Sequence, residues 1–197
     1  MLIVAIVLAA GESRRMGRPK QTLNVGGVPM LQRVLDMLRK TKVDRVVVVT
    51  GAHWEELRAA VKFGKEEVIH NEGYAEGMGS SLRAGIAAAG TADAVLIVLA
   101  DQPSVLPDTV DALIAGYRSS EKRIVAPVYH GRRGNPVLFD RALFPKMSQV
   151  RGDVGAKAIV ERNRDFLLEI PVEDDGVVTD IDEPDDLDGF RLPDGPE

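Results

Sequence analysis

A loop near the N-terminus carries the residue types that bind phosphate. It runs from Leu8 to Lys20 with the sequence LAAGESRRMGRPK, which contains small residues, glycines and four cations. Small residues let backbone N–H groups approach a ligand closely, and the cations require an anionic partner, so a polyphosphate fits both features. The loop has neither the Gly-x4-Gly-Lys-Ser/Thr of a Walker A motif nor the Gly-x-Gly-x-x-Gly of a dinucleotide-binding fold. It is therefore a phosphate loop of another kind, or a basic turn whose cations face water.

Carboxylates occur at two places where they could hold a metal ion. Asp101 is the first polar residue after the apolar run over residues 94–100, which places it at the end of an expected strand. A carboxylate beside a triphosphate is repulsive unless a cation lies between them, and Mg²⁺ is commonly held by one or two carboxylates plus phosphate oxygens. The same position also suits a helix N-cap. An acidic cluster near the C-terminus fits a second ligand, a solvated face or a helix start: Asp180, Asp182, Asp185 and Asp186.

A glycine-rich segment over residues 73–81 leads into an expected helix and contains two serines. A helix N-terminus opened in this way can face an anion or a ribose. We therefore expect Gly77, Ser80 and Ser81 to contact a nucleotide; the alternative is a flexible loop with Ser80 as N-cap. The three histidines have no metal-ligand spacing and are interpreted as structural or solvated: His53, His70 and His130.

Strands alternating with helices must position these residues. Continuous apolar runs predict buried strands at 2–8, 45–50 and 94–100, and weaker runs predict strands at 67–69, 124–128 and 167–170. Helical periodicity predicts helices at 31–38, 54–63, 80–89 and 110–117. This alternation predicts an α/β fold with a three-layer, doubly wound, mostly parallel sheet. Ligands in such sheets bind beyond the carboxyl ends of the strands, where the phosphate loop and Asp101 both begin.

Composition limits the function classes. The chain has 197 residues, 45% of them hydrophobic, so we expect one domain over residues 1–190 with a frayed tail at 191–197. The net charge of −5, with both signs dispersed, argues against a nucleic-acid or anionic-membrane binder recruited by bulk charge. The absence of cysteine excludes disulfides, thiolate zinc sites, iron–sulfur clusters and a cysteine nucleophile. No apolar run is long enough to span a bilayer, and we expect a cytoplasmic protein.

The motifs taken together resemble a known family. The loop pattern Leu-Ala-Ala-Gly-x-Ser-x-Arg-Met-Gly-x-x-Lys is similar to the signature of the MobA/MocA-like nucleotidyltransferases, which act on the molybdenum cofactor. Its Leu-Ala-Ala-Gly start resembles the cytidylyl branch more than the guanylyl branch. Five further blocks resemble this family in order: residues 71–82 (NEGYAEGMGSSL), 99–103 (LADQP), 131–136 (GRRGNP), 152–157 (GDVGAK) and 180–187 (DIDEPDDL). The resemblance covers nearly the whole chain.

The resemblance implies a Rossmann-like nucleotidyltransferase fold and specific roles for residues. It places the base and phosphates of a nucleotide near Leu8, Ala9, Ala10 and Gly11. It makes Arg15 and Lys20 the clamp on the triphosphate, whereas Arg14 and Arg18 match variable positions. It assigns Mg²⁺ to Asp101 and Asp182, with Asp180 as the alternative second ligand. It assigns the acceptor to Arg133, Gly134, Asn135 and Asp153. Asn135 departs from the His that is frequent in the cytidylyl branch, and Asp153 also suits a helix cap.

The implied reaction is transfer of CMP from CTP to the phosphate of molybdopterin that carries molybdenum, with release of pyrophosphate and with Mg²⁺ as cofactor. An ionised phosphate nucleophile needs no general base, so this mechanism requires alignment and charge neutralisation rather than a Ser–His–Asp triad. Two alternatives remain. One is a related transferase with GTP or another acceptor, and the other is a relative that binds the cofactor or performs redox chemistry without transfer. Docking to a molybdoenzyme or its chaperone is a further expectation.

Overall fold

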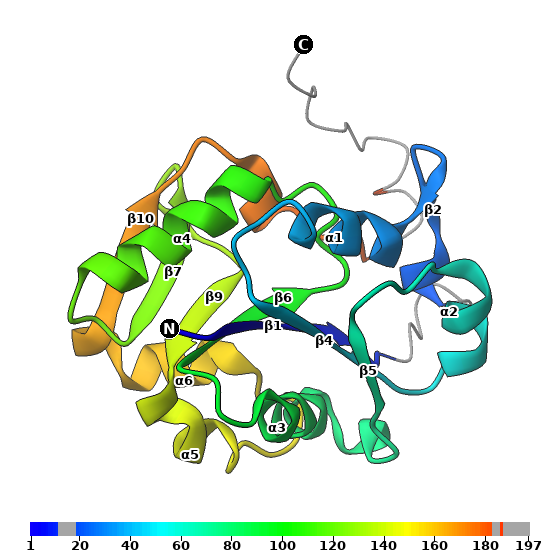
Figure 1. Cartoon of the computed structure of the whole chain (residues 1–197), viewed down its shortest axis with the longest axis horizontal. Coiled ribbons are helices and arrows are strands. Elements are labelled where there is room, and N and C mark those ends of the chain that lie inside the picture. The colour runs from blue at the N-terminus through cyan, green and yellow to red at the C-terminus, as the bar shows by residue number, and fades with distance from the viewer. Residues whose placement is uncertain (12–18, 183–185, 187–197) are drawn as a thin grey trace.

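The strands predicted from apolar runs form the centre of one sheet. A computed structural model of the chain describes residues 1–11, 19–182 and 186. Strand β1 (Ile3–Ala9) lies between β4 (Arg45–Thr50) and β6 (Ala94–Leu99) and is parallel to both. Strand β5 (Glu67–His70) extends the parallel arrangement beyond β4 (Figure 1). Because these strands are parallel, their carboxyl ends meet at one edge, as the sequence predicted.

The sheet becomes mixed beyond β6. Strand β9 (Val137–Asp140) is antiparallel to both β6 and β7 (Ile124–Tyr129), and β10 (Leu167–Pro171) pairs parallel with β7. The short strand β8 (Arg132–Arg133) folds back on β7, giving the order β10-β7-β9-β6-β1-β4-β5 with β8 off this path. The sequence did not predict β8 or β9, because runs this short between glycine, proline and arginine residues carry no clear period.

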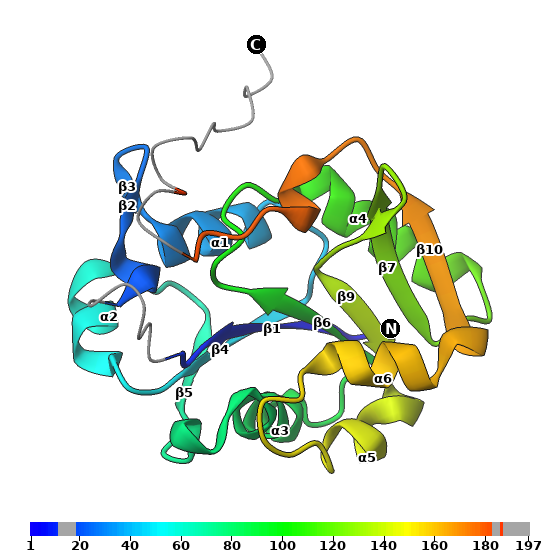
Figure 2. The ribbon, with the colours of Figure 1, turned by 180° about the vertical axis from the view of Figure 1, so that it is seen from behind.

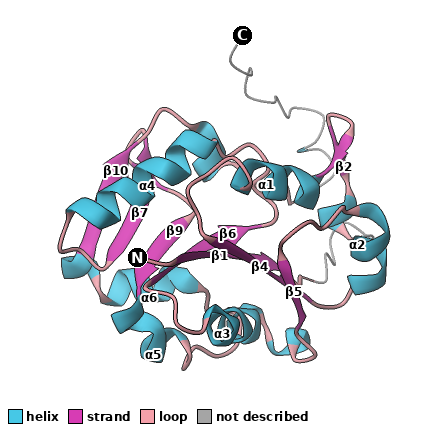
Figure 3. Ribbon diagram, in the orientation of Figure 1, coloured by secondary structure: helices cyan, strands magenta, loops and turns pink. Residues whose placement is uncertain are grey.

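Helices cover both faces of the sheet. On one face lie α1 (Met30–Leu38), α2 (Trp54–Ala60) and α4 (Pro107–Ser119), and on the other lie α3 (Met78–Ala89), α5 (Phe144–Met147) and α6 (Ala156–Arg162) (Figures 2 and 3). The side chains of β1 alternate between the two cores: Ile3, Ala5 and Val7 face the first, and Val4 and Ile6 face the second. The predicted three-layer α/β fold is therefore confirmed.

Close packing of α3 fixes its position against the sheet. A Cβ at Gly85 would collide with Ile6 and lie 3.3 Å from Val49 Cγ2, so a side chain there has no room. Helix α3 therefore sits directly on β1 and β4. Its first residues are held at the carboxyl edge of the sheet by this contact.

Short elements complete the fold. A hairpin of β2 (Asn24–Val25) and β3 (Val28–Pro29) turns through Gly26 and Gly27, both at positive φ. Single 3-10 turns occur at 20–22, 74–76, 141–143, 164–166 and 175–178. None of the helices in the described part of the chain is long and apolar enough to cross a membrane.

Candidate active site

A cavity of about 490 Å³ opens at the carboxyl edge of the sheet, and we call it the strand-end cavity. It forms where β1 and β6 end side by side, because Leu8 is paired with Leu99 across the two strands. Its walls come from the loops after these strands, the first turn of α3 and the segment before α6. Its lining residues are Leu8, Ala10, Gly11, Lys20, Gln21, Tyr74, Ala75, Gly77, Met78, Ser81, Leu99, Ala100, Asp101 and Asp153. Eight residues predicted from the sequence are among them: Leu8, Ala10, Gly11, Lys20, Gly77, Ser81, Asp101 and Asp153.

Lys20 brings together two carboxylates that are distant in sequence. Its Nζ lies 2.7 Å from Asp101 Oδ2 and 2.8 Å from Asp182 Oδ1, so one ammonium bridges both side chains. The three residues come from the loop after β1, the loop after β6 and the C-terminal segment. The fold therefore places the predicted phosphate-binding lysine and the predicted metal ligands at one point.

The C-terminal segment is anchored immediately before Asp182. The backbone N–H of Ile181 donates to Asp101 O at 2.9 Å, and the Ile181 side chain is fully buried. It packs in a small core with Leu23, Val25 and Met30 around the β2–β3 hairpin. Burial of one isoleucine thus fixes the carboxylate that follows it.

The charges at this point stabilise one another. Burial of Lys20 lowers its pKa. The charges of Asp101 and Asp182 and their hydrogen bonds together raise the pKa by more than burial lowers it, so the net pKa lies above the usual value. The pKa of Asp180 is raised by burial, and the negative charges of Asp182 and Asp101 add to the increase. Asp180 therefore lies near the same pair, and the choice between Asp180 and Asp182 as second ligand stays open.

The donor set fits a hard divalent cation. Asp101 Oδ1 is buried and has no hydrogen-bond partner among the described residues, so its lone pairs face no donor from that part of the chain. Carboxylate oxygens are the ligands that Mg²⁺ prefers, and phosphate oxygens and water complete its shell. No group of three or more His, Cys, Asp or Glu side chains within the described ranges is arranged to hold a metal. Asp101 with Asp182 or Asp180 would therefore hold such an ion together with a ligand's phosphates.

The first turn of α3 is locked to the segment before α6. Gly77 has φ of 100°, and a Cβ there would lie 2.6 Å from Asp153 Oδ1. The Gly79 N–H donates to Gly152 O at 2.9 Å. Such close contact requires glycine, and it brings Asp153 to the cavity wall.

The two predicted serines differ in position. Asn71 Nδ2 donates to Ser80 Oγ at 2.8 Å and to Ser81 Oγ at 3.1 Å. The Ser80 hydroxyl also donates to Gly77 O at 2.9 Å, inside a helix that begins at Met78. Ser80 is therefore not the N-cap that the alternative interpretation supposed, and it is outside the cavity lining, whereas Ser81 is part of it.

Several lining residues were not predicted from the sequence: Gln21, Tyr74, Ala75, Met78, Leu99 and Ala100. A Cβ at Gly51 would lie 2.8 Å from Ala10 O and from Tyr74 Cβ, so the backbone of the residue after β4 packs closely against both lining residues. The signal for Tyr74 was its place in the block over residues 71–82, but an isolated aromatic residue gives no indication that it faces a cavity.

The remaining acceptor candidates lie outside the cavity lining. Arg133 forms ion pairs with Glu161 and with Glu169, the latter at 3.7 Å. Gly134 and Asn135 are held by backbone bonds, from Gly134 N to Pro127 O at 3.0 Å and from Asn135 N to Val177 O at 2.8 Å. The structure therefore brings Asp153, but not these three, to the strand-end cavity.

One residue predicted to bind the nucleotide, Ala9, is not among the residues that line the strand-end cavity. Ala9 is the last residue of β1 and is buried in the core. Arg15, the second predicted phosphate clamp, lies outside the described residues, as does the expected tail at 191–197.

The fold and the site define a class: an α/β nucleotidyltransferase fold with a strand-end cavity that combines small residues, a lysine and two carboxylates. The chain matches the MobA-like NTP transferase domain over residues 5–166, and it belongs to this family.

Relatives of the chain carry different names. It is 32% identical to the nicotine blue oxidoreductase of Paenarthrobacter nicotinovorans over 91% of this chain and 92% of that protein. It is 30% identical to the purine catabolism protein PucB of Bacillus subtilis over 96% of each chain. A probable molybdenum cofactor guanylyltransferase of Pyrococcus horikoshii is 32% identical over 64% of this chain and 62% of its own length.

Among solved structures, Rv0371c of Mycobacterium tuberculosis H37Rv is 28% identical with a TM-score of 0.85 over 96% of each chain. A structure of Rv0371C in complex with manganese matches with a TM-score of 0.76 and 28% identity over 87% of this chain and 89% of that one. The family is thus shared by proteins with more than one named activity.

Proposed function

We propose that this protein transfers CMP from CTP to the phosphate of molybdenum-carrying molybdopterin, with release of pyrophosphate and with Mg²⁺ as its cofactor. The observation that carries the proposal is the Lys20 ammonium placed between Asp101 and Asp182 on the wall of the strand-end cavity. Membership of an NTP transferase family supports a nucleoside triphosphate as substrate. The relative named as a molybdenum cofactor guanylyltransferase supports the acceptor class.

Substrate positioning explains the chemistry without a general base. An oxygen of the acceptor phosphate forms a bond to the α-phosphorus of CTP, and the bond from that phosphorus to the bridging oxygen of pyrophosphate breaks. The leaving pyrophosphate takes the electron pair. Because the nucleophile is already ionised, catalysis consists of alignment and neutralisation of charge. A bound Mg²⁺ supplies part of that neutralisation at the phosphates.

The chain's own residues have separate tasks. Ala10 and Gly11 leave room for phosphates to approach the backbone after β1. Lys20 lies between Asp101 and Asp182, and its ammonium would neutralise charge on the triphosphate, while the two carboxylates would hold Mg²⁺. Asp153 also lines this cavity, and of the four residues predicted to meet the acceptor it is the one that does so.

The choice of CTP rests on the Leu-Ala-Ala-Gly start of the loop, which resembles the cytidylyl branch. The backbone of Gly51, the residue after β4, packs closely against two lining residues of the cavity, Ala10 and Tyr74. GTP remains the alternative base.

Thermal unfolding with each nucleoside triphosphate, with and without Mg²⁺, tests this proposal. A ligand that binds only the folded protein raises the unfolding midpoint. We expect the largest increase with CTP and Mg²⁺ together. The absence of an increase with any nucleotide would contradict the transferase assignment.

An oxidoreductase is the second candidate, because the relative named nicotine blue oxidoreductase aligns with 91% of this chain. The residues at the strand-end cavity favour transfer: the loop after β1 lacks the Gly-x-Gly-x-x-Gly dinucleotide pattern, and Lys20 with two carboxylates suits a triphosphate and metal. Loss of absorbance of NADH or NADPH in the presence of an electron-accepting dye would support the second candidate. Pyrophosphate release from CTP would support the first.

A further inference from the structure

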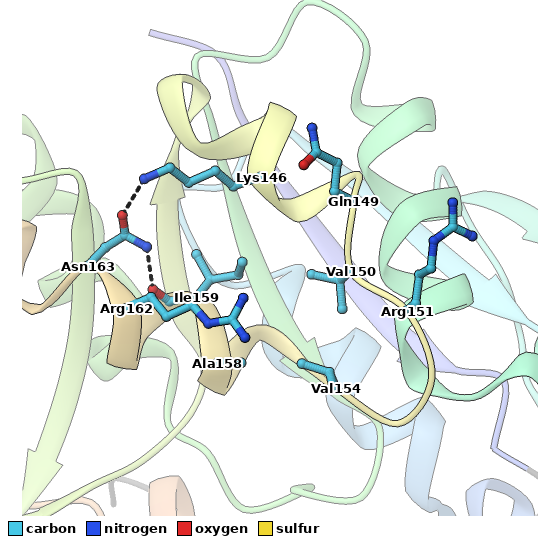
Figure 4. Close-up of a pocket in the computed structure, with 9 residues that line it drawn as sticks. All are labelled: Lys146, Gln149, Val150, Arg151, Val154, Ala158, Ile159, Arg162 and Asn163. Carbon is cyan, nitrogen blue, oxygen red and sulfur yellow. Dashed lines mark hydrogen bonds between the residues drawn. The ribbon is translucent and has the colours of Figure 1, made fainter.

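A second cavity, of about 530 Å³, lies between α5 and α6, and we call it the helix-pair cavity (Figure 4). It is lined by Lys146, Gln149, Val150, Arg151, Val154, Ala158, Ile159, Arg162 and Asn163. None of these residues lines the strand-end cavity. Its volume is nevertheless similar to that of the proposed nucleotide site.

The lining of the helix-pair cavity is cationic. Lys146, Arg151 and Arg162 contribute positive charge, and no Asp or Glu is among its lining residues, in a chain whose net charge is −5. The guanidinium groups of Arg151 and Arg162 form no hydrogen bond or ion pair with any residue that the structure describes. By contrast, Arg133 and Arg164 nearby both pair with Glu161.

Lys146 is oriented by a neutral partner. Its Nζ donates to Asn163 Oδ1 at 2.6 Å, and Asn163 Nδ2 donates to Ile159 O at 2.7 Å. Asn163 is buried, so this chain of bonds holds the lysine without cancelling its charge. Figure 4 shows Arg151 on one side of Val150, and Lys146 and the Arg162 guanidinium on the other.

The space between the cations is apolar. Val150 and Ile159 are buried, and Val154 is an exposed hydrophobic residue at the rim. Guanidinium groups bind phosphate and carboxylate in a bidentate manner, and an apolar surface accepts a ring or a hydrocarbon chain. A small organic anion with an apolar body matches both parts of this lining.

The two cavities share one short segment. Asp153 lines the strand-end cavity, whereas its neighbour Val154 and the nearby Arg151 line the helix-pair cavity. Arg83 holds this segment, because its Nη1 donates to Val150 O at 2.7 Å and its Nη2 donates to Glu76 Oε2 at 2.8 Å. A ligand that fixes Arg151 would therefore also fix the wall that carries Asp153.

We propose that the helix-pair cavity binds a small organic anion, with a phosphate or carboxylate group on an apolar body, through Arg151 and Arg162. The site is separate from the proposed transfer chemistry. Through residues 151–154, its occupancy changes the affinity of the strand-end cavity for nucleotide, and the effect is reciprocal.

Methyl NMR of the full chain tests this proposal with three probes: phenyl phosphate, benzoate and inorganic phosphate. Methyl groups of Val154 and Ile159 report on the helix-pair cavity, and those of Leu8 and Leu99 report on the strand-end cavity. We expect phenyl phosphate or benzoate to shift the first pair in a saturable way and inorganic phosphate to bind more weakly because it lacks the apolar body. A stronger effect of phenyl phosphate than of benzoate identifies phosphate as the preferred group, and the reverse identifies carboxylate.

A matched pair of variants provides the control. Arg151→Gln with Arg162→Gln removes two charges from the cavity, and Arg118→Gln with Arg132→Gln removes two exposed charges elsewhere. We expect at least a 10-fold weaker affinity for the first double variant and an unchanged affinity for the second.

Equal affinity in both double variants, or shifts confined to Leu8 and Leu99, would overturn the site. The absence of saturable shifts at Val154 and Ile159 with all three probes would overturn it as well. Failure of CTP to shift Leu8 and Leu99 would instead count against the proposed function and would leave the anion site standing.

Discussion

Replacing Lys20 by Met removes the cation that joins Asp101 and Asp182 while keeping a side chain of similar length. Lys20 donates two charge-assisted hydrogen bonds, at 2.7 and 2.8 Å, and the side chains of Lys20 and Asp101 are 16% and 21% exposed. Such bonds contribute about 1.5–3 kcal/mol each, and the 44% exposure of Asp182 reduces the second through solvent screening. We therefore expect the metal-free variant to lose about 2–3 kcal/mol of unfolding free energy.

This loss corresponds to a fall of about 6 °C in the unfolding midpoint for a chain of this size. Added Mn²⁺ or Mg²⁺ should restore much of the midpoint in Lys20→Met, because a divalent cation replaces the missing charge. Without nucleotide, the variant should also bind Mn²⁺ more tightly than the wild type, since no ammonium competes for the carboxylates. Binding is measured by the electron paramagnetic resonance signal of free Mn²⁺.

Lys122→Met is the matched control. Lys122 Nζ donates to a neutral group, Asp165 O, at 2.7 Å on the surface, and we expect its loss to change stability by less than about 0.5 kcal/mol. The reasoning is refuted if Lys20→Met is as stable as the control and gains no more than the wild type from Mn²⁺. The proposed phosphate role further predicts that Lys20→Met lowers kcat by about 100-fold or more, although it binds the metal more tightly.

Three further predictions concern the carboxylates. Asp101→Asn should keep the fold and lower Mg²⁺-dependent pyrophosphate release by about 100-fold or more, whereas full residual activity would remove Asp101 from the site. In Mn²⁺ titrations with CTP present, the variant that lacks the second metal-binding carboxylate should lose more affinity for Mn²⁺. We expect the larger loss with Asp182→Asn, and a larger loss with Asp180→Asn would make Asp180 the second ligand. Burial raises the pKa of Glu66, but the hydrogen bond from Arg39 and backbone donors lower it more, so the net pKa lies below its ordinary value of 4.5. The stabilising effect of this ionised carboxylate is therefore full above the unfolded-state pKa and is lost as the pH falls through the folded-state pKa. The difference in unfolding midpoint between the wild type and Glu66→Gln should decrease from pH 6 to pH 3, and a constant difference would contradict the assignment.

The centre of the fold could be predicted from the sequence because its signal is local. The runs at β1, β4 and β6 are continuous and aliphatic, since both faces of a central parallel strand are buried. Strand β9 was missed because it has four residues and pairs antiparallel between strands from other parts of the chain. Helices α5 and α6 are short, with four and seven residues, and give too few turns for a clear period.

The candidate site was predictable in its residue types but not in its contacts. Lys20 and Asp101 follow β1 and β6, so the topology of a parallel sheet was enough to place them together. Asp182 was assigned from family resemblance, and its position depends on burial of Ile181 against the β2–β3 hairpin, which no local pattern indicates. The ion pairs of Arg133 with Glu161 and Glu169 join β8, α6 and β10, and they could not be deduced from residues that are far apart in sequence. The role of Arg133 in binding the acceptor stays a prediction.

The central claim is tested most directly by turnover with Mg²⁺, molybdenum-carrying molybdopterin, and either CTP or GTP, with products identified by mass spectrometry. Our account predicts the cytosine dinucleotide and an equal amount of pyrophosphate from CTP, much less product from GTP, and turnover lower by about 100-fold or more with Asp101→Asn. A guanine dinucleotide as the main product would contradict the base assignment. The absence of any dinucleotide, in a protein that is folded and binds CTP, would contradict the transfer itself.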